Sequence, residues 1–140
     1  DMPSKSNYLI ERPRITAENS VNNEVNNKIF IIENDEAMTL LLNTILDLQG
    51  YDVTVINNYE KIPECTPALI ILDAGSIDTL KGIEICRQIR KNPNFDKTKV
   101  ILTSVYHDKE MVLNAGADLY IPKPYEISNL IKWIEKLLNT

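Results

Sequence analysis

The stretch Ala68-Leu69-Ile70-Ile71-Leu72-Asp73 sets five apolar residues in a row and ends on a carboxylate. A continuous apolar run of this length is typical of a strand buried on both faces in a parallel sheet. Because burying an unpaired charge is costly, we expect Asp73 at the carboxyl-terminal mouth of the strand and not inside the sheet. In open α/β sheets ligands bind at this mouth, so Asp73 is the predicted centre of a functional site.

Three other apolar segments are each followed directly by polar residues. These segments and the residues after them are 28–32 with Glu33 and Asn34, 99–102 with Thr103, and 119–122 with Lys123. If the strands are parallel, one edge of the sheet gathers all these polar groups around Asp73. Oxygen ligands for Mg²⁺, a nucleophilic carboxylate, a hydroxyl and an ammonium are the groups that phosphoryl transfer to a carboxylate requires.

Strand and helix patterns alternate along the chain from residue 28. The expected strands are 28–32, 51–56, 68–72, 99–102 and 118–121, and the expected helices are 36–49, a short one of one or two turns within 57–67, 82–91, 108–115 and 126–138. This alternation predicts a doubly wound α/β fold of the flavodoxin-like type, with right-handed crossovers and helices on both faces. The expected order of the five parallel strands is 2-1-3-4-5, with the switch point between strands 1 and 3.

The spacing of apolar residues predicts which face of each helix is buried. For the first helix these residues are Ala37, Leu40, Leu41, Thr44, Ile45 and Leu48, for the helix at 82–91 they are Ile85, Cys86 and Ile89, and for the last helix they are Ile127, Leu130, Ile131, Ile134, Leu137 and Leu138. Trp133 falls off the apolar face of the last helix. Gly50 and Gly116 are expected to end the helices that precede them.

Composition limits the classes of function. The net charge of −5 argues against direct nucleic-acid binding, and no apolar run approaches the length of a membrane helix. Two isolated cysteines without metal-ligand spacing favour reduced thiols and a cytoplasmic location. Residues 1–27 are interpreted as a linker or disordered N-terminal segment, and 28–140 as one domain. Because residue 1 is Asp, the chain is expected to be a processed form or a fragment, with an output domain N-terminal to the linker.

Together these motifs resemble the receiver domain of bacterial two-component response regulators, over residues 28–140. The matching pieces are Glu33-Asn34-Asp35, Asp73, Thr103-Ser104, Ala115-Gly116-Ala117-Asp118, Tyr120 and Lys123-Pro124. The resemblance implies a regulatory domain and not a conventional enzyme. It implies that a sensor histidine kinase or phosphotransfer protein phosphorylates Asp73, and that phosphorylation switches an output domain or partner. A weak homodimer of the domain is also expected.

The resemblance also implies a role for each matching residue. Glu33, Asn34, Asp73 and the backbone carbonyl of Gly75 would bind Mg²⁺. Thr103 and Lys123 would hold the phosphoryl oxygens, Thr103 and Tyr120 would act as the switch, and the Lys123–Pro124 peptide bond would be cis, which proline permits at low cost.

The sequence departs from the family pattern at two places that matter for phosphorylation. The family has two Asp after its first strand, whereas Glu33 and Asn34 stand here, so we expect weak Mg²⁺ binding because the ligand charge is lower. The loop 74–82 lacks the usual Pro and is one residue longer. Gly75 and Val105 occupy the positions that tune hydrolysis in the family. Neither can orient a water, which predicts slow loss of a phosphoryl group.

A second interpretation is a pseudo-receiver, which keeps the fold as a protein-interaction module and takes no phosphate. Asn34 and the altered loop 74–82 favour it, whereas Asp73, Thr103 and Lys123 favour the phosphorylated receiver. Two enzymes of similar topology fit less well. A flavodoxin would need a phosphate-binding loop where Glu33-Asn34-Asp35 stands, and a haloacid-dehalogenase-type phosphatase would need an Asp at position 75, which is Gly.

Overall fold

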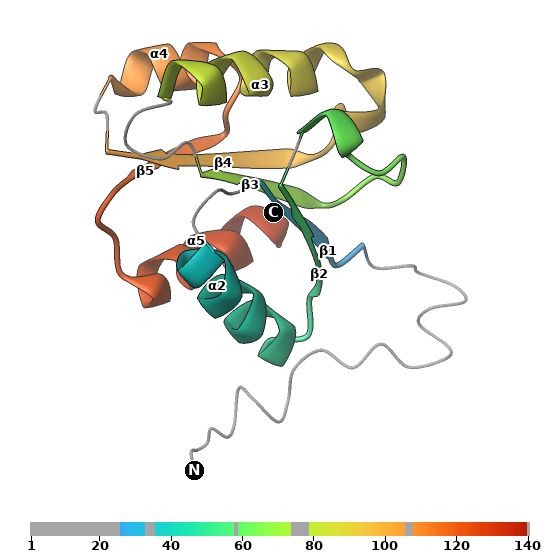
Figure 1. Ribbon diagram of the computed structural model, residues 1–140, viewed down its shortest axis with the longest axis vertical. Helices are drawn as coiled ribbons and strands as arrows, with labels where there is room; N and C mark the ends of the chain where they lie inside the picture. Colours follow the sequence, from blue (N-terminus) through green and yellow to red (C-terminus); the bar gives the residue numbers. More distant parts are fainter. Residues whose placement is uncertain (1–25, 33–35, 58, 74–78, 106–107, 140) are drawn as a thin grey trace.

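The computed structural model describes residues 26–32, 36–57, 59–73, 79–105 and 108–139 (Figure 1). Its strands are β1 (Lys28–Ile32), β2 (Asp52–Ile56), β3 (Leu69–Asp73), β4 (Lys99–Ser104) and β5 (Leu119–Pro122). Its α-helices are α2 (Glu36–Leu48), α3 (Thr79–Lys91), α4 (Lys109–Asn114) and α5 (Ile127–Leu138), and its 3₁₀ turns are η2 (Tyr59–Lys61) and η3 (Pro93–Phe95). In these described ranges no helix is both long and apolar enough to cross a membrane.

The five strands form one parallel sheet in the order β2-β1-β3-β4-β5, which confirms the predicted fold class and strand order. β1 lies between β2 and β3, with Ile32 opposite Leu72. Asp73, the last residue of β3, pairs with Thr103 of β4. The ends of β1, β3 and β4 therefore meet at one edge of the sheet.

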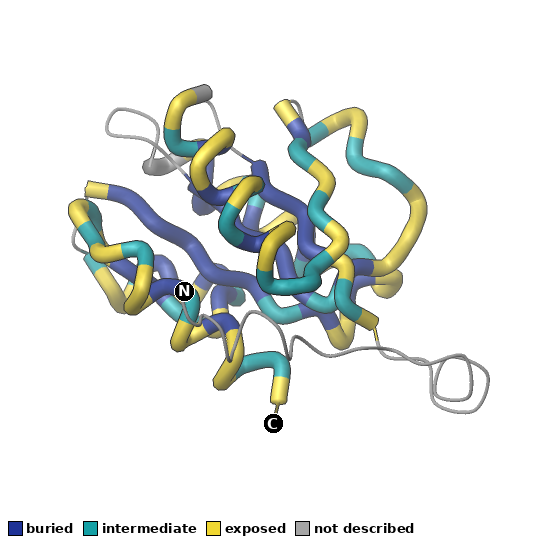
Figure 2. Tube along the Cα trace, turned by 90° about the horizontal axis from the view of Figure 1, so that it is seen from below, coloured by how far each residue is buried: buried dark blue, intermediate teal, exposed yellow. Residues whose placement is uncertain are grey.

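Alternate strand residues enter two cores, one on each face of the sheet. Figure 1 shows α2 and α5 on one face and α3 and α4 on the other, and Figure 2 shows the buried strands between these helices. The core between the sheet and helices α2 and α5 contains Ile29, Ile31, Leu42, Leu46, Leu69, Ile71, Ile101, Ile121, Leu130 and Ile134. The core between the sheet and helices α3 and α4 contains Phe30, Ile32, Ile70, Leu72, Ile83, Cys86, Ile89, Val100, Leu102, Val112 and Tyr120, among others. Every residue of β3 is buried, as expected for a central strand covered on both faces.

The prediction for the buried face of α2 is wrong. Leu40, Leu41 and Leu48 are 67%, 46% and 53% exposed, while Leu42 and Leu46 are fully buried. Ala37 and Thr44 are also exposed, and Ile45 is half-buried. The cause is that α2 is apolar on more than one side, so the spacing of its apolar residues fits two faces. Docking on the sheet, and not the periodicity, selects the face with Leu42 and Leu46.

The other helices follow the predictions more closely. α5 buries Leu130 and Ile134 completely, with its other predicted residues packed around them, and leaves Trp133 exposed. α3 begins at Thr79, three residues before the predicted 82, and buries Ile83 with Cys86 and Ile89, while Ile85 is only half-buried. The segment between β2 and β3 forms the single turn η2, in keeping with the two prolines that follow it.

Candidate functional site

The candidate site lies where β3, β4 and β5 end. Asp73 is opposite Thr103 in the register of β3 and β4, and Ser104 is opposite Pro122 in the register of β4 and β5. The backbone N–H of Lys123 donates a hydrogen bond to the Ser104 carbonyl oxygen at 2.8 Å. This bond extends the β4–β5 pairing by one residue and directs Lys123 toward the end of β3. The Lys123–Pro124 bond that follows is cis.

Asp73 and Lys123 form an ion pair inside the site. Nζ of Lys123 lies 2.5 Å from Oδ1 of Asp73, and the two side chains are 19% and 2% exposed, respectively. Asp73 lies at the end of its strand, as expected, but it is buried there and not open to water. The ammonium of Lys123 compensates the carboxylate charge, which is the usual condition for a buried charge.

Thr103 places a hydroxyl beside this ion pair. The residue is fully buried, and within the described ranges its Oγ1 has no hydrogen-bond partner. Buried hydroxyls are nearly always hydrogen-bonded, so an exception suggests a partner that the protein itself does not supply. A hydroxyl donor next to an ammonium can bind the oxygens of an anion held at Asp73.

The Tyr120 side chain is buried in the core between the sheet and helices α3 and α4. Its hydroxyl donates a hydrogen bond to the Ser104 carbonyl oxygen at 3.2 Å and lies 3.4 Å from the Ser104 hydroxyl. The same carbonyl accepts the Lys123 N–H, so Ser104 connects the tyrosine with the lysine that binds Asp73. The sequence pattern predicts no role for Ser104. Its position directly after Thr103 was the only signal, and a single serine at a strand end carries little information.

The predicted metal ligands fall mostly outside the described part of the chain. Glu33, Asn34 and Gly75 are not described, so their placement stays a prediction. β1 ends at Ile32 beside Leu72, which brings the strand that leads to Glu33 next to the strand that ends in Asp73. Among the described residues there is no group of three or more His, Cys, Asp or Glu side chains that could hold a metal. Asp73 is thus the one predicted side-chain ligand for Mg²⁺ that the structure places.

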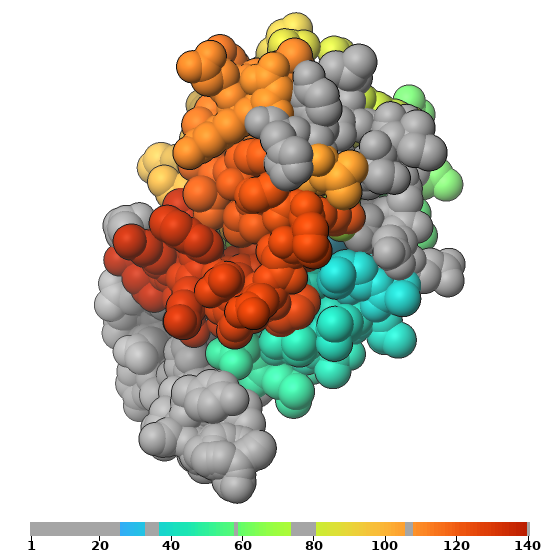
Figure 3. Space-filling model, turned by 90° about the vertical axis from the view of Figure 1, so that its left-hand side faces the viewer, coloured from blue at the N-terminus to red at the C-terminus, as the bar shows by residue number. Residues whose placement is uncertain are grey.

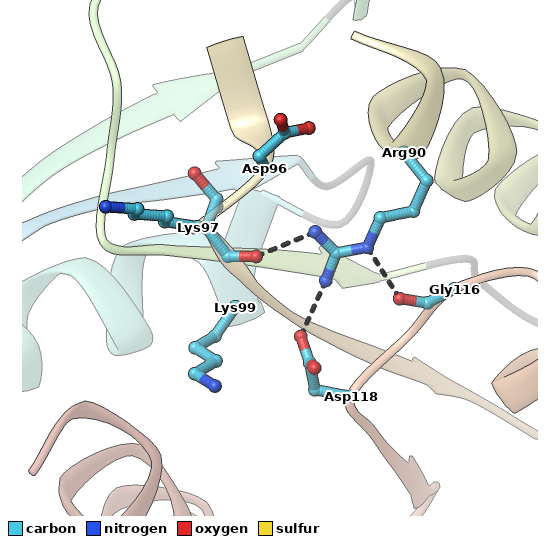
Figure 4. Close-up of a pocket in the computed structure, with 7 residues that line it drawn as sticks. Arg90, Asp96, Lys97, Lys99, Gly116 and Asp118 are labelled. Atoms are coloured by element: carbon cyan, nitrogen blue, oxygen red, sulfur yellow. Dashed lines mark hydrogen bonds and ion pairs between the residues drawn. The ribbon is translucent and has the colours of Figure 1, made fainter. Parts of the chain in front are cut away.

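A polar hollow of about 300 Å³ lies at the opposite edge of the sheet (Figure 4). Its centre is Arg90, which donates hydrogen bonds to the carbonyl oxygens of Gly116, Thr98 and Phe95 and pairs with Asp118 at 2.6 Å. Asp118 also accepts the N–H of Val100. Since these groups bind one another, we interpret Arg90 and its partners as a structural clamp that joins α3, β4 and β5.

The fold and the site define a receiver domain. The sequence profile of the response regulator receiver domain matches residues 29–135, and the chain belongs to this family.

Individual relatives agree with this assignment. The phosphate regulon transcriptional regulatory protein PhoB of Rhizobium meliloti (strain 1021) is 33% identical over 118 residues, covering 79% of this chain and 52% of PhoB. Response regulator ArlR of Staphylococcus saprophyticus is 34% identical over 115 residues, with the same two coverages. The chain spans about half the length of the curated relatives it matches.

Solved structures share the fold. A CheY-like response regulator receiver domain protein from Methanospirillum hungatei JF-1 is 27% identical with a TM-score of 0.66, over 80% of this chain and 93% of that one. The receiver domain of the Francisella response regulator 1452 gives a TM-score of 0.69 at 24% identity, over 81% of this chain and 98% of that one. The latter likeness concerns the fold alone.

Proposed function

We propose that this receiver domain accepts a phosphoryl group on Asp73 from a phosphohistidine donor in a two-component pathway. A carboxylate oxygen of Asp73 forms a bond to phosphorus, the P–N bond breaks, and the imidazole leaves with the electron pair and takes a proton. Lys123 and Thr103 bind the phosphoryl oxygens as charge develops on them. The convergence of Asp73, Thr103 and Lys123 at one sheet edge is the observation that carries this proposal.

Mg²⁺ is the cofactor we propose, because hard oxygen ligands suit it. Its chemistry would be to neutralise negative charge on the phosphoryl group during transfer. Asp73, Glu33, Asn34 and the Gly75 carbonyl would hold it, weakly because Asn34 is uncharged. The receiver domain of the sensor histidine kinase PA1611 from Pseudomonas aeruginosa PAO1, which shares the fold at 21% identity and a TM-score of 0.64, was solved with a magnesium ion in its active site cleft.

Phosphorylation would act on Thr103 and Tyr120, which connect the site to the rest of the fold. When Thr103 binds the phosphoryl group, its shift is passed to Ser104, whose carbonyl holds the Tyr120 hydroxyl. The equilibrium between two positions of Tyr120 then reports the state of Asp73 to an output domain or partner. The homologues carry their output domain C-terminal to the receiver, so they do not support the N-terminal position expected from the sequence.

Treatment of the chain with acetyl phosphate and Mg²⁺, followed by mass spectrometry of the intact protein, tests the proposal. We expect a gain of about 80 Da, the mass of one phosphoryl group. Asp73→Asn should show no gain in mass, and Lys123→Met should show a smaller gain than the wild-type chain. Lys97→Met is the matched control. This exposed lysine lies by the polar hollow at the opposite edge of the sheet, so Asp73 of this variant should be phosphorylated normally.

The slow hydrolysis expected from the sequence is tested on the phosphorylated protein. Val105 is 40% exposed and has no group that can activate a water. We expect the phosphorylated form to persist for minutes or longer after excess acetyl phosphate is removed. Decay within seconds would contradict this expectation without affecting the phosphoacceptor role of Asp73.

A pseudo-receiver is the second candidate, and Asn34, which replaces a charged metal ligand with a neutral amide, favours it. In that case the ion pair is a permanent structural feature and the domain binds partners without phosphorylation. The same mass measurement separates the two functions, because a pseudo-receiver gains no mass even at high Mg²⁺ concentration.

A further inference from the structure

β2 is an edge strand that lacks the usual protection of an edge. Within the described ranges it pairs with β1 alone (Figure 1). Its sequence, Asp52-Val53-Thr54-Val55-Ile56, is rich in β-branched residues and contains no Lys and no Pro. Edge strands commonly carry such residues because the unpaired N–H and C=O groups of an edge can pair with another chain. The other edge strand, β5, has only four residues and ends in Pro122.

The backbone groups of Val53 and Val55 point away from the sheet. The Asp52 N–H donates a hydrogen bond to the Asn27 carbonyl oxygen at 3.0 Å, on the side of β1. Since the N–H and C=O groups of successive strand residues alternate in direction, Asp52, Thr54 and Ile56 bond to β1 and the two valines face outward. Two N–H donors and two C=O acceptors are therefore available at this edge.

The space beside this edge is open on both faces of the sheet. On one face α2 packs over β2, with Val53 at the margin of the core that contains Leu42 and Leu46. Figure 3 shows the cyan and teal atoms of α2 beside the red atoms of α5, and among the described elements no helix follows α2 toward the outer side of β2. On the other face η2 is a single turn, and Asp52 and Thr54 stay exposed. A strand from outside can thus reach the edge.

β2 is complementary to a second copy of itself in the antiparallel direction. A two-fold axis through Thr54 places Val53 of one copy opposite Val55 of the other. Each of the two valine pairs then exchanges two main-chain hydrogen bonds, which uses every outward N–H and C=O group of these residues. The two Thr54 side chains meet at the axis and form a favourable cross-strand pair.

Charge favours antiparallel over parallel pairing. Asp52 is the one charged residue of β2, and its carboxylate pairs with the Lys28 ammonium at 2.9 Å. In the antiparallel dimer the two copies of Asp52 are four residues apart along the strands, roughly 14 Å, so salt screens their repulsion. Parallel pairing in register would set the two carboxylates side by side, and it could not close with two-fold symmetry.

We propose that a second copy of this chain extends the sheet at β2, so that the two five-stranded sheets join through an antiparallel β2–β2 pair. The two-fold axis passes through the sheet at Thr54, and α5 takes no part in the contact. A single strand pair buries less surface than the roughly 1,600 Å² of a standard interface, so the dimer is weak and reversible.

Disulfide trapping detects a weak dimer and reports its register. The experiment uses the full chain with Cys65→Ser, which removes the exposed thiol. Thr54→Cys in this background places two thiols at the two-fold axis. The Cα atoms of such a directly opposed pair are about 4.5 Å apart, within the range that a disulfide spans. Oxidation with diamide should therefore give a covalent dimer on non-reducing electrophoresis.

Asp52→Cys in the same background is the matched control for the register. This position is also exposed and lies on the same strand. Its two copies are roughly 14 Å apart in the proposed dimer, so it should cross-link at least about tenfold more slowly than Thr54→Cys. Equal rates for the two variants would indicate random collisions and would overturn the proposal.

Val55→Pro tests the main-chain hydrogen bonds. Proline removes the outward N–H of Val55 and keeps every bond to β1, which an edge strand tolerates. Added to the Thr54→Cys chain it should abolish the cross-link, whereas Val55→Ala keeps the N–H and should leave the cross-link in place. Circular dichroism of each variant checks that the fold is intact. A cross-link that survives Val55→Pro overturns the proposal.

A Thr54→Cys chain that stays monomeric on oxidation also overturns the proposal. If the introduced thiol is then protected from a soluble thiol reagent as well, an extended segment of the same chain covers the edge. None of these results bears on the phosphoacceptor role of Asp73, which mass spectrometry measures separately.

Discussion

Lys123 binds Asp73 across the ends of two strands that are not neighbours, since β4 lies between β3 and β5. The lysine side chain thus passes the end of β4, where Thr103 lies. This contact closes the candidate site and compensates a carboxylate that is almost completely removed from water. Its contribution to stability and its proposed role in phosphoryl transfer can be separated by substitution.

Lys123→Met should lower the free energy of unfolding at neutral pH by about 1–3 kcal/mol, because it leaves the buried Asp73 carboxylate without its cation. Urea unfolding measures this change. The double variant Asp73→Asn with Lys123→Met removes both charges and should be more stable than Lys123→Met alone. Equal stability of these two variants would show that leaving the Asp73 carboxylate buried without its cation costs nothing.

Thr103→Val should separate phosphorylation from folding. Valine has nearly the shape of threonine, and Oγ1 of Thr103 has no partner among the described residues, so the free energy of unfolding should stay the same or rise. The rate of phosphorylation by acetyl phosphate should fall roughly tenfold or more, the effect of losing one donor to a developing charge. Thr103→Ser keeps the hydroxyl and should keep the rate. A normal rate in Thr103→Val would remove Thr103 from the site.

Tyr120→Phe should destabilise the protein by about 1 kcal/mol, the typical contribution of a buried hydrogen bond. The ring stays in the core, while the bond to the Ser104 carbonyl oxygen and the 3.4 Å contact with the Ser104 hydroxyl are lost. Ser104→Ala removes the neighbouring hydroxyl but keeps this carbonyl, so it should cost less. Thermal unfolding of both variants provides the comparison, and a larger loss in Ser104→Ala would contradict the assigned bond.

Gly116→Ala should cost more stability than Gly50→Ala. Both glycines have positive φ angles, 110° and 99°, which other residues adopt at a cost of about 1 kcal/mol. At Gly116 an added Cβ would also overlap Cγ of Arg90, whose side chain the clamp holds in place. Urea unfolding of the two variants measures the difference. A smaller loss for Gly116→Ala would mean that Arg90 can move without cost.

Alkaline pH should destabilise the protein partly through Cys86. Burial raises the pKa of this thiol to about 11 from its ordinary value of 9.0, with a smaller opposing effect of Arg90. The folded state therefore holds the proton more tightly than the unfolded chain. The resulting stability is complete below pH 9 and is lost as the pH rises toward 11. Burial also raises the pKa values of Tyr51 and Tyr59, which act in the same direction.

The measurement is the free energy of unfolding between pH 8 and pH 11, in roughly unit steps that span the ordinary thiol pKa. Cys86→Ala should show a weaker dependence on pH than the wild-type chain, while the tyrosines maintain part of it. The native protein should also react with a thiol reagent at the exposed Cys65 well before Cys86. An unchanged pH dependence in Cys86→Ala would assign the whole effect to the tyrosines.

The amino-acid sequence was enough to predict the parallel sheet and the edge at which the candidate site lies. Continuous apolar runs such as 69–72 are typical of a central parallel strand, and polar residues directly after such runs are then expected at the carboxyl edge. The proximity of Asp73, Thr103 and Lys123 follows from these two rules. The strand order was expected from the alternation of strands and helices. Local chemistry also predicted the helix ends at Gly50 and Gly116, where a positive φ angle is needed.

Three features became apparent only in the folded protein: which side of α2 is buried, that Ser104 holds Tyr120, and that Arg90 clamps the opposite edge of the sheet. Apolar spacing reports that a helix has an apolar face, but α2 has two, and the shape of the sheet selects the one with Leu42 and Leu46. The contacts of Ser104 and Arg90 join residues far apart in the chain. Such contacts depend on how side chains fill space after the elements have packed, which residue types and their spacing do not encode.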